Sequence, residues 1–242
     1  MEASRRNHNS IRHMESSTPK GKIIVIDGGA NVGKATQADM LTNRLLNEGR
    51  NVGKLDFPRY HQNTFGRLVQ ECLADAHTPM SELPPKIAAT LYAADRFEAK
   101  SEIMEWLEEG RTIILDRYVS ANMLHQGVKF AHADEREEFF RWVDHVEYTI
   151  FGLPKPDIIV YLDIPAQKSE KLLEYVEGLG VKVTAPEDQA ELHQAKVSEC
   201  AHYLSTIHPE WHTIQYLDNT GELRTREDIH EEVYKVISAR LS

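Results

Sequence analysis

The sequence predicts an α/β fold in three layers, with helices on both faces of a parallel central sheet. Several short runs rich in Ile, Val and Leu are apolar at nearly every position, as expected for strands buried on both faces. These runs alternate with longer segments whose apolar residues have helical spacing. The chain has 242 residues, of which 41% are hydrophobic, so it can bury a core, and we expect one domain over residues 22–242.

Strands and helices are predicted to alternate along the chain. Residues 22–26 form a β-branched run followed by glycines, and residues 38–46 then have helical spacing. The other predicted strands are residues 52–57, 112–116, 156–163 and 212–217. The other predicted helices are residues 65–73, 85–109, 135–148, 166–174, 187–204 and 225–241.

Composition excludes several classes of protein. The formal net charge is −10 and there is no Lys/Arg-rich run, so we expect no nucleic-acid partner, because that affinity needs many cations facing phosphates. No apolar stretch reaches the roughly 18 residues that span a bilayer, so no membrane partner is expected. The two cysteines, Cys72 and Cys200, are far apart and lack metal-ligand spacing, which favours a reducing compartment.

Residues 1–21 are predicted to be a flexible N-terminal tail. They are rich in Ser, Asn, His and Arg, with almost no bulky apolar residue, so they cannot supply the apolar core of a secretory signal. A transit peptide is the alternative, because of the Arg and Ser content.

Residues 28–35 match the phosphate-loop pattern G-x-x-x-x-G-K-[ST] at every fixed position except the last. A predicted strand precedes this loop and a helix follows it. Backbone N–H groups and the helix dipole bind phosphate there, and the lysine reaches the β- and γ-phosphates. An ordinary strand-to-helix turn is the alternative. We expect a nucleoside triphosphate to bind Gly28, Gly29, Ala30, Asn31, Val32, Gly33, Lys34, Ala35 and Thr36.

Ala35 is the position at which the loop departs from this pattern. The hydroxyl normally found there binds Mg²⁺. Thr36 is adjacent, but neighbouring helical positions point about 100° apart, so it is not a simple substitute. We therefore expect weakened metal binding.

The triplet Asp116-Arg117-Tyr118 stands at the end of the predicted strand 112–116. Ligands of such folds collect at this carboxyl edge, where Asp116 would face Mg²⁺ and Arg117 would bind phosphate through two N–H groups. A salt bridge at the strand end is the alternative. Together with the phosphate loop, the triplet favours phosphoryl transfer.

Tyr92 and Arg96 are four residues apart in a predicted helix, and therefore lie on one face of it. An aromatic ring with a guanidinium one turn away can stack on a base and donate a hydrogen bond to its carbonyl oxygen, which suits a pyrimidine. The alternative is a Tyr92 packed in the core and an Arg96 in a surface ion pair.

With these motifs the chain resembles the thymidylate kinases, P-loop enzymes that transfer the γ-phosphate of ATP to dTMP and give dTDP. The resemblance runs from about residue 22 to the C-terminus. It rests on the phosphate loop at 28–37, DFPR at 56–59, LYAADR at 91–96, DRYVSAN at 116–122 and PDIIVYLD at 156–163. It implies ATP and dTMP as substrates, Mg²⁺ as cofactor, and a cytoplasmic homodimer packed through helices.

The resemblance also implies roles for single residues. Tyr92 would stack on thymine, Arg96 would donate to its O4, and the Asn122 amide would read the base. Phe57 would line the same pocket, and Arg59 would bind the acceptor phosphate. Lys34 and Arg117 resemble the phosphate clamps, and Asp116 resembles the carboxylate that faces the metal.

The chain departs from the family at several catalytic positions. Ala30 replaces an acid that members usually carry two residues after the first loop glycine. Members also supply an arginine to the transferred group, from the loop or from a lid. Here the loop carries Asn31, and no arginine occurs between residues 141 and 224.

The family lid corresponds to about residues 174–186, which we expect to be short and mobile, with Lys182 as its one cation. The expected catalytic residues are Lys34, Arg117 and Lys182. A solvated loop lysine is the alternative for Lys182.

Three functions are compatible with these residues. The first is a dTMP kinase whose activity is reduced by Ala35 and by the missing arginine. The second is a catalytically impaired relative that binds nucleotide and acts as a sensor or partner. The third is a kinase for another nucleoside monophosphate.

Overall fold

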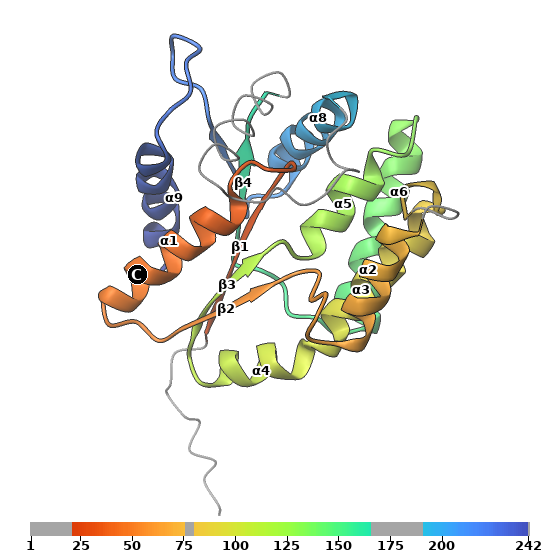
Figure 1. Ribbon diagram of the computed structural model, residues 1–242, viewed down its shortest axis with the longest axis horizontal. Helices are drawn as coiled ribbons and strands as arrows, with labels where there is room; N and C mark the ends of the chain where they lie inside the picture. Colours follow the sequence, from red (N-terminus) through yellow and green to blue (C-terminus); the bar gives the residue numbers. More distant parts are fainter. Residues whose placement is uncertain (1–20, 76–79, 166–190, 242) are drawn as a thin grey trace, which may run out of the picture.

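The computed structural model describes residues 21–75, 80–165 and 191–241. Within these ranges, five strands form one parallel sheet in the order β2-β3-β1-β4-β5 (Figure 1). The strands are β1 (Lys22–Gly28), β2 (Val52–Asp56), β3 (Thr112–Asp116), β4 (Ile158–Asp163) and β5 (Trp211–Gln215). All five predicted strands are confirmed, each with ends within about two residues of the prediction.

Eight α-helices are described in these ranges, together with two short helical turns. The helices are α1 (Lys34–Asn47), α2 (Thr64–Ala74), α3 (Pro85–Glu98), α4 (Lys100–Glu108), α5 (Val119–Gly127), α6 (Ala133–Asp144), α8 (Glu191–Ile207) and α9 (Arg226–Leu241). The turns are the 3₁₀ segment η1 (Met80–Glu82) and the π-helical segment η2 (His145–Ile150).

The helices form a layer on each face of the sheet, as predicted. Side chains alternate between faces along a strand, so Ile24 and Ile26 of β1 pack with α1 and α9, whereas Ile23 and Val25 pack with α4, α5 and α8. Figure 1 shows α1 and α9 on one side of the sheet and the other helices opposite, with α2, α3 and α6 beyond α5. The fold class is therefore confirmed.

The predicted helix over residues 85–109 is wrong as a single element. It breaks at Ala99, whose N–H donates to the Arg96 carbonyl at 3.1 Å, and α4 starts at the next residue. The two halves pack on different partners, because α3 lies against α2 and α5 whereas Ile103 and Leu107 of α4 join the core beneath the sheet. No proline or glycine marks this break in the sequence.

Two further segments differ from the prediction. Helix α5 was not predicted, and the helix expected over 135–148 ends at Asp144 and continues as the wider turn η2. The helix expected over 166–174, the lid at 174–186 with Lys182, and residues 1–20 lie outside the described residues.

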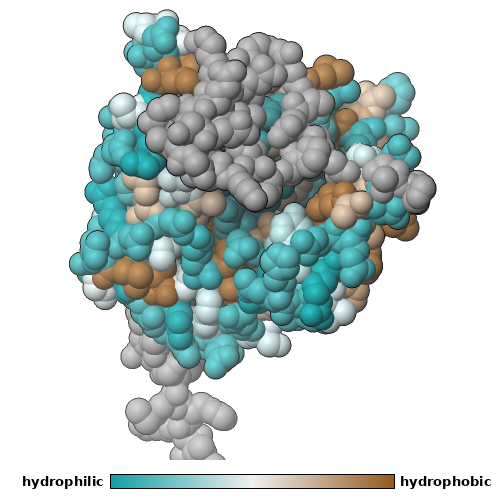
Figure 2. Space-filling view, in the orientation of Figure 1, coloured by the Kyte–Doolittle hydropathy of each residue, from teal (hydrophilic) through white to brown (hydrophobic). Residues whose placement is uncertain are grey.

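Figure 2 shows a face that is largely hydrophilic, with apolar residues in small separate patches. Among the helices that the structure describes, none combines the length and the apolar character needed to cross a membrane. Cys72 and Cys200 are both free thiols.

Candidate active site at the carboxyl edge of the sheet

The phosphate loop joins β1 to α1 and turns tightly. Gly33 has φ 80° and Asn31 has φ 55°, both in the left-handed region that glycine and asparagine tolerate best. At Gly28 an added Cβ would lie 2.8 Å from the Leu162 carbonyl oxygen and 2.8 Å from a Val32 methyl. The glycine at position 28 is therefore needed for close packing of the loop against β4.

Two side chains stabilise the loop by donating hydrogen bonds to its carbonyl groups. The Tyr216 hydroxyl donates to the carbonyl of Val32, whose side chain is buried. The Lys34 ammonium donates across the loop to the Gly29 carbonyl and is 8% exposed. Both bonds hold the loop curved around one point, as binding of a phosphate chain by backbone N–H groups requires.

Ala35 and Thr36 are both exposed at the start of α1. Ala35 brings no hydroxyl to the loop. The next side chain inward, Gln37, is 1% exposed and donates to the Arg226 carbonyl at 3.0 Å, which ties α1 to α9. Position 35 therefore offers no side-chain oxygen to a metal at this edge.

A pair of carboxylates lies at the ends of neighbouring strands. Ile26 of β1 pairs in register with Asp116, the last residue of β3, and Asp27 is the next residue of β1. Asp27 is fully buried and accepts hydrogen bonds from the Gly28 N–H at 2.9 Å and the Ser120 hydroxyl at 2.5 Å. Burial raises the pKa of Asp27 above its ordinary value, against the opposing effect of Arg117 and these hydrogen bonds.

Asp116 differs from Asp27 in its partners. Burial raises the pKa of Asp116, and the charge of Asp27 adds to this, whereas Lys34 and Arg117 oppose it. Only burial and nearby charges shift this pKa, and no described donor hydrogen-bonds to the Asp116 carboxylate. Its oxygens are therefore available to a cation.

Arg117 supplies the second positive charge at this edge. Its φ is 64°, unusual for a residue other than glycine, and its N–H donates to the Ile26 carbonyl at 3.0 Å. Because Lys34 and Arg117 both act on the pKa values of Asp27 and Asp116, the four side chains form one electrostatic group. This group places two cations that could bind phosphate beside the Asp116 carboxylate, which could bind a metal.

A second group of side chains lies between α3, α5 and η2. The Nε and Nη2 atoms of Arg96 donate to the two carboxylate oxygens of Glu147 at 2.7 and 2.8 Å. The Asn122 amide donates to the same carboxylate at 2.7 Å and to the Ala89 carbonyl at 2.9 Å. Arg96, Asn122 and Glu147 are each at most 2% exposed. The structure thus brings Arg96 and Asn122 together, as the base-binding prediction requires.

Arg59 is held near this group by polar contacts. Its backbone N–H donates to the Asp95 carboxylate at 3.1 Å, one residue before Arg96. Its guanidinium donates to Glu102 at 2.7 Å and to the Gln62 side chain at 2.7 and 3.0 Å. Arg59 is therefore held by an ion pair, and its binding to an acceptor phosphate would have to compete with Glu102.

The two predicted aromatic residues occupy different surroundings. Phe57 is 5% exposed and lies in the core beneath the sheet. Its ring is tilted relative to that of Tyr118, and the two ring centroids are 6.1 Å apart. Tyr92 is partly buried and packs against a small cluster that includes Val69 and Ala88. Tyr92 thus keeps part of its surface outside the core.

Three residues of these groups were missed by the sequence analysis: Asp27, Ser120 and Glu147. Ser120 lies inside the DRYVSAN motif and Asp27 directly precedes the phosphate loop, so both had a signal in the sequence. Glu147 gave no signal, because an acid in a helical segment normally reads as a surface residue.

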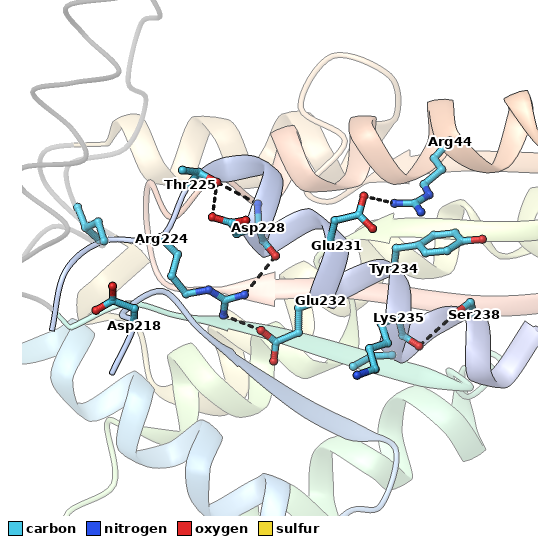
Figure 3. A pocket seen from close by; sticks show the side chains of 12 residues that line it. Arg44, Asp218, Arg224, Thr225, Asp228, Glu231, Glu232, Tyr234, Lys235 and Ser238 are labelled. Carbon is cyan, nitrogen blue, oxygen red and sulfur yellow. Dashed lines mark hydrogen bonds and ion pairs between the residues drawn. The ribbon is translucent and has the colours of Figure 1, made fainter. Parts of the chain in front are cut away.

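A separate pocket lies along α9, with Arg44 reaching it from α1 (Figure 3). Its arginines pair with acids of α9, since Arg44 contacts Glu231 at 2.7 Å and Arg224 contacts Glu232 at 2.6 Å. Because acids already neutralise these arginines, we assign no ligand to the pocket.

Comparison with known proteins gives concordant results. The thymidylate kinase family model matches residues 26–227. Thymidylate kinase of Mycobacterium tuberculosis (strain ATCC 25618 / H37Rv) is 32% identical over 145 residues, which cover 60% of this chain and 67% of that protein. Thymidylate kinase of Plasmodium falciparum (isolate 3D7) is 26% identical over 225 residues, 93% of each chain. A solved thymidylate kinase from Candida albicans has the same fold, with a TM-score of 0.68 and 24% identity over 91% of this chain and 92% of that one.

Proposed function

Since the chain belongs to the thymidylate kinase family, we propose that the side chains at the carboxyl edge of its sheet carry the transfer of phosphate from ATP to dTMP. The reaction is that of a dTMP kinase, which gives ADP and dTDP. One observation supports this assignment of residues. The charges of Lys34 and Arg117 both act on the Asp116 carboxylate, so the three side chains lie near one another beside the phosphate loop.

On the donor side, residues 28–36 bind the triphosphate of ATP. Backbone N–H groups of the loop and the start of α1 face the phosphates, and Lys34 moves from the Gly29 carbonyl to the β- and γ-phosphates. Arg117 lies where charge spreads over the transferred phosphoryl group, and stabilises it. The acceptor phosphate is already largely a dianion at pH 7, with a second pKa near 6, so no general base is needed.

The Asp116 carboxylate would hold Mg²⁺ at this edge. Asp116 offers oxygens to which no described donor binds, and such hard oxygen ligands suit Mg²⁺. Of the residues that the structure describes, no group of three or more His, Cys, Asp or Glu side chains could hold a metal. Mg²⁺ is often bound by one or two carboxylates together with substrate phosphates, and Asp116 beside the phosphate loop would suit such a site. When bound, Mg²⁺ neutralises charge on the transferred phosphate.

On the acceptor side, dTMP lies over α3 and α5. Tyr92 stacks on thymine, Arg96 donates to O4, Asn122 contacts the base and Phe57 backs the pocket. Arg59 binds the acceptor phosphate after exchanging its contact with Glu102. Lys182, outside the described residues, is proposed as the third cation, on a lid over residues 174–186.

The test is release of ADP from ATP and dTMP with Mg²⁺. We expect activity from the wild-type chain and a loss of about 100-fold or more in Lys34→Met. Lys235→Met, on α9, is the matched control and should keep activity. Binding of both nucleotides without ADP release would instead establish the catalytically impaired relative, and faster turnover of another monophosphate would establish the third alternative.

We also propose a homodimer packed through helices, in the cytoplasm. Phe65 and Leu68 of α2 and Ile87 of α3 leave 38%, 37% and 54% of their surface exposed on adjacent helices. Exposed apolar side chains on two helices that pack against each other favour a contact surface there. Sedimentation of the wild-type chain and of Leu68→Glu tests this: the charge should shift a dimer to monomer, and a monomeric wild type would refute it.

A further inference from the structure

Glu147 is a buried acid with every oxygen engaged by residues from other elements. It is 1% exposed, on the π-helical turn η2, and receives Arg96 from α3 and Asn122 from α5. The wider turn that follows α6 projects this side chain inward, and π-turns of this kind are frequent at functional sites. Burial lowers the pKa of Arg96, but the charge and hydrogen bonds of Glu147 outweigh it and raise that pKa, so Arg96 stays a cation.

These contacts fix the orientation of the Asn122 amide. Its nitrogen lies 2.7 Å from Oε1 of Glu147 and 2.9 Å from the carbonyl oxygen of Ala89. A carboxylate and a carbonyl only accept hydrogen bonds, so the oxygen of Asn122 cannot take that place. The amide oxygen must therefore point the other way, and no described donor bonds to it.

The same carboxylate fixes which edge of Arg96 is left for a ligand. Glu147 takes Nε and Nη2, so that among the described residues Nη1 has no hydrogen-bond acceptor. Arg96 thus presents a donor and Asn122 presents an acceptor, both set by one acid.

We propose that Glu147 is a positioning residue that sets the choice of acceptor base, by holding Arg96 as a donor and Asn122 as an acceptor toward it. This inference rests on the proposed function, in which these two residues meet the base. Thymine carries a carbonyl at C4 beside an N3–H, and matches a donor followed by an acceptor. Cytosine carries an amino group at C4 beside a bare N3, so both contacts would oppose like groups. A site with fixed polar groups rejects such a mismatch strongly, because buried partners are left without hydrogen bonds.

Glu147→Gln is the variant that tests this. Its amide places an N–H₂ group against Arg96 or Asn122, which removes the reason for Asn122 to keep its oxygen toward the base. We expect the ratio of kcat/KM for dTMP to that for dCMP to fall roughly 10- to 100-fold. Glu147→Asp keeps two acceptor oxygens, so it should retain the preference for dTMP even if turnover drops.

Asp157→Asn is the matched control. Asp157 accepts from the Lys22 ammonium and from the Ile23 N–H, both at 2.9 Å, at the opposite edge of the sheet. This change from carboxylate to amide should leave the base preference unaltered. Equal losses for dTMP and dCMP in Glu147→Gln would overturn the proposal, because a merely structural role lowers both together.

Equilibrium binding of dTMP and dCMP separates this inference from the proposed function. A wild-type chain that prefers dTMP in binding but releases no ADP refutes the function and leaves the inference standing. A wild-type chain that releases ADP while Glu147→Gln keeps its preference refutes the inference alone. If Glu147→Gln does not fold, Asn122→Leu tests the acceptor half of the contact. The preference for dTMP should fall in part, since Arg96 remains a donor, and an unchanged ratio of kcat/KM for dTMP to that for dCMP overturns the proposal.

Discussion

The hydrogen bond from Ser120 to Asp27 offers a test of how the carboxyl edge is held together. Ser120→Ala removes one of the two donors to a carboxylate that is 0% exposed. The remaining donor is the Gly28 N–H, and the alanine leaves no group that can replace the hydroxyl. We therefore expect Ser120→Ala to destabilise the protein most when Asp27 is charged.

The expected loss follows from the burial of both partners. A buried hydrogen bond to a charged group contributes about 2 kcal/mol, and one between neutral groups about 1 kcal/mol. For a domain of this size, about 2 kcal/mol lowers Tm by about 4–8 °C. Burial raises the pKa of Asp27, so the loss should be full above this raised pKa and should fall toward about 1 kcal/mol as the pH drops through it.

Urea unfolding at a series of pH values, from the ordinary pKa of an aspartate upward, measures this. The raised pKa also means that wild-type stability from this group falls as the pH rises through that value, and Asp27→Asn should remove this dependence. In the Asp27→Asn background, Ser120→Ala should cost the same at every pH. Ser205→Ala is the control, since its hydroxyl donates to the His202 carbonyl at the surface. A loss for Ser120→Ala that stays the same across this pH series would refute the reasoning.

Three further changes probe the same edge. Asp116→Asn should raise Tm, because burial disfavours the charged carboxylate, while turnover falls about 100-fold or more; a lower Tm in a thermal melt would contradict this. Ala35→Ser should raise turnover several-fold at limiting Mg²⁺, since it restores the hydroxyl, and an unchanged Mg²⁺ titration would show that this oxygen is not needed. Glu102→Gln should lower the KM for dTMP several-fold by releasing Arg59, and a higher KM would mean that the ion pair holds Arg59 ready.

The sheet could be predicted from the sequence because each strand is a short apolar run whose signal is local. The break at Ala99 could not, since it comes from the different partners of α3 and α4 and not from a residue that disfavours helix. Helix α5 was missed because it is short and follows a recognised motif directly. Eight of its nine residues are buried, so it lacks the polar face that marks a surface helix.

The residues of the candidate site also differ in whether the sequence could predict them. Lys34, Asp116 and Arg117 belong to contiguous motifs, and the structure brings them together. Glu147 is 51 residues from Arg96 and 25 residues from Asn122, and nothing local distinguishes it from a surface acid. Its role depends on long-range contacts that only the folded chain reveals.

The bond from Tyr216 to Val32 joins residues that are 184 positions apart. The ribosome therefore makes the glycines of the loop long before the tyrosine that anchors the loop. The central strand β1 likewise has no partner strands until β3 and β4, with which it pairs, have been translated. A growing chain would therefore carry the phosphate motif before it has the bond that holds the loop in shape, and that bond can form only after residue 216 has been made.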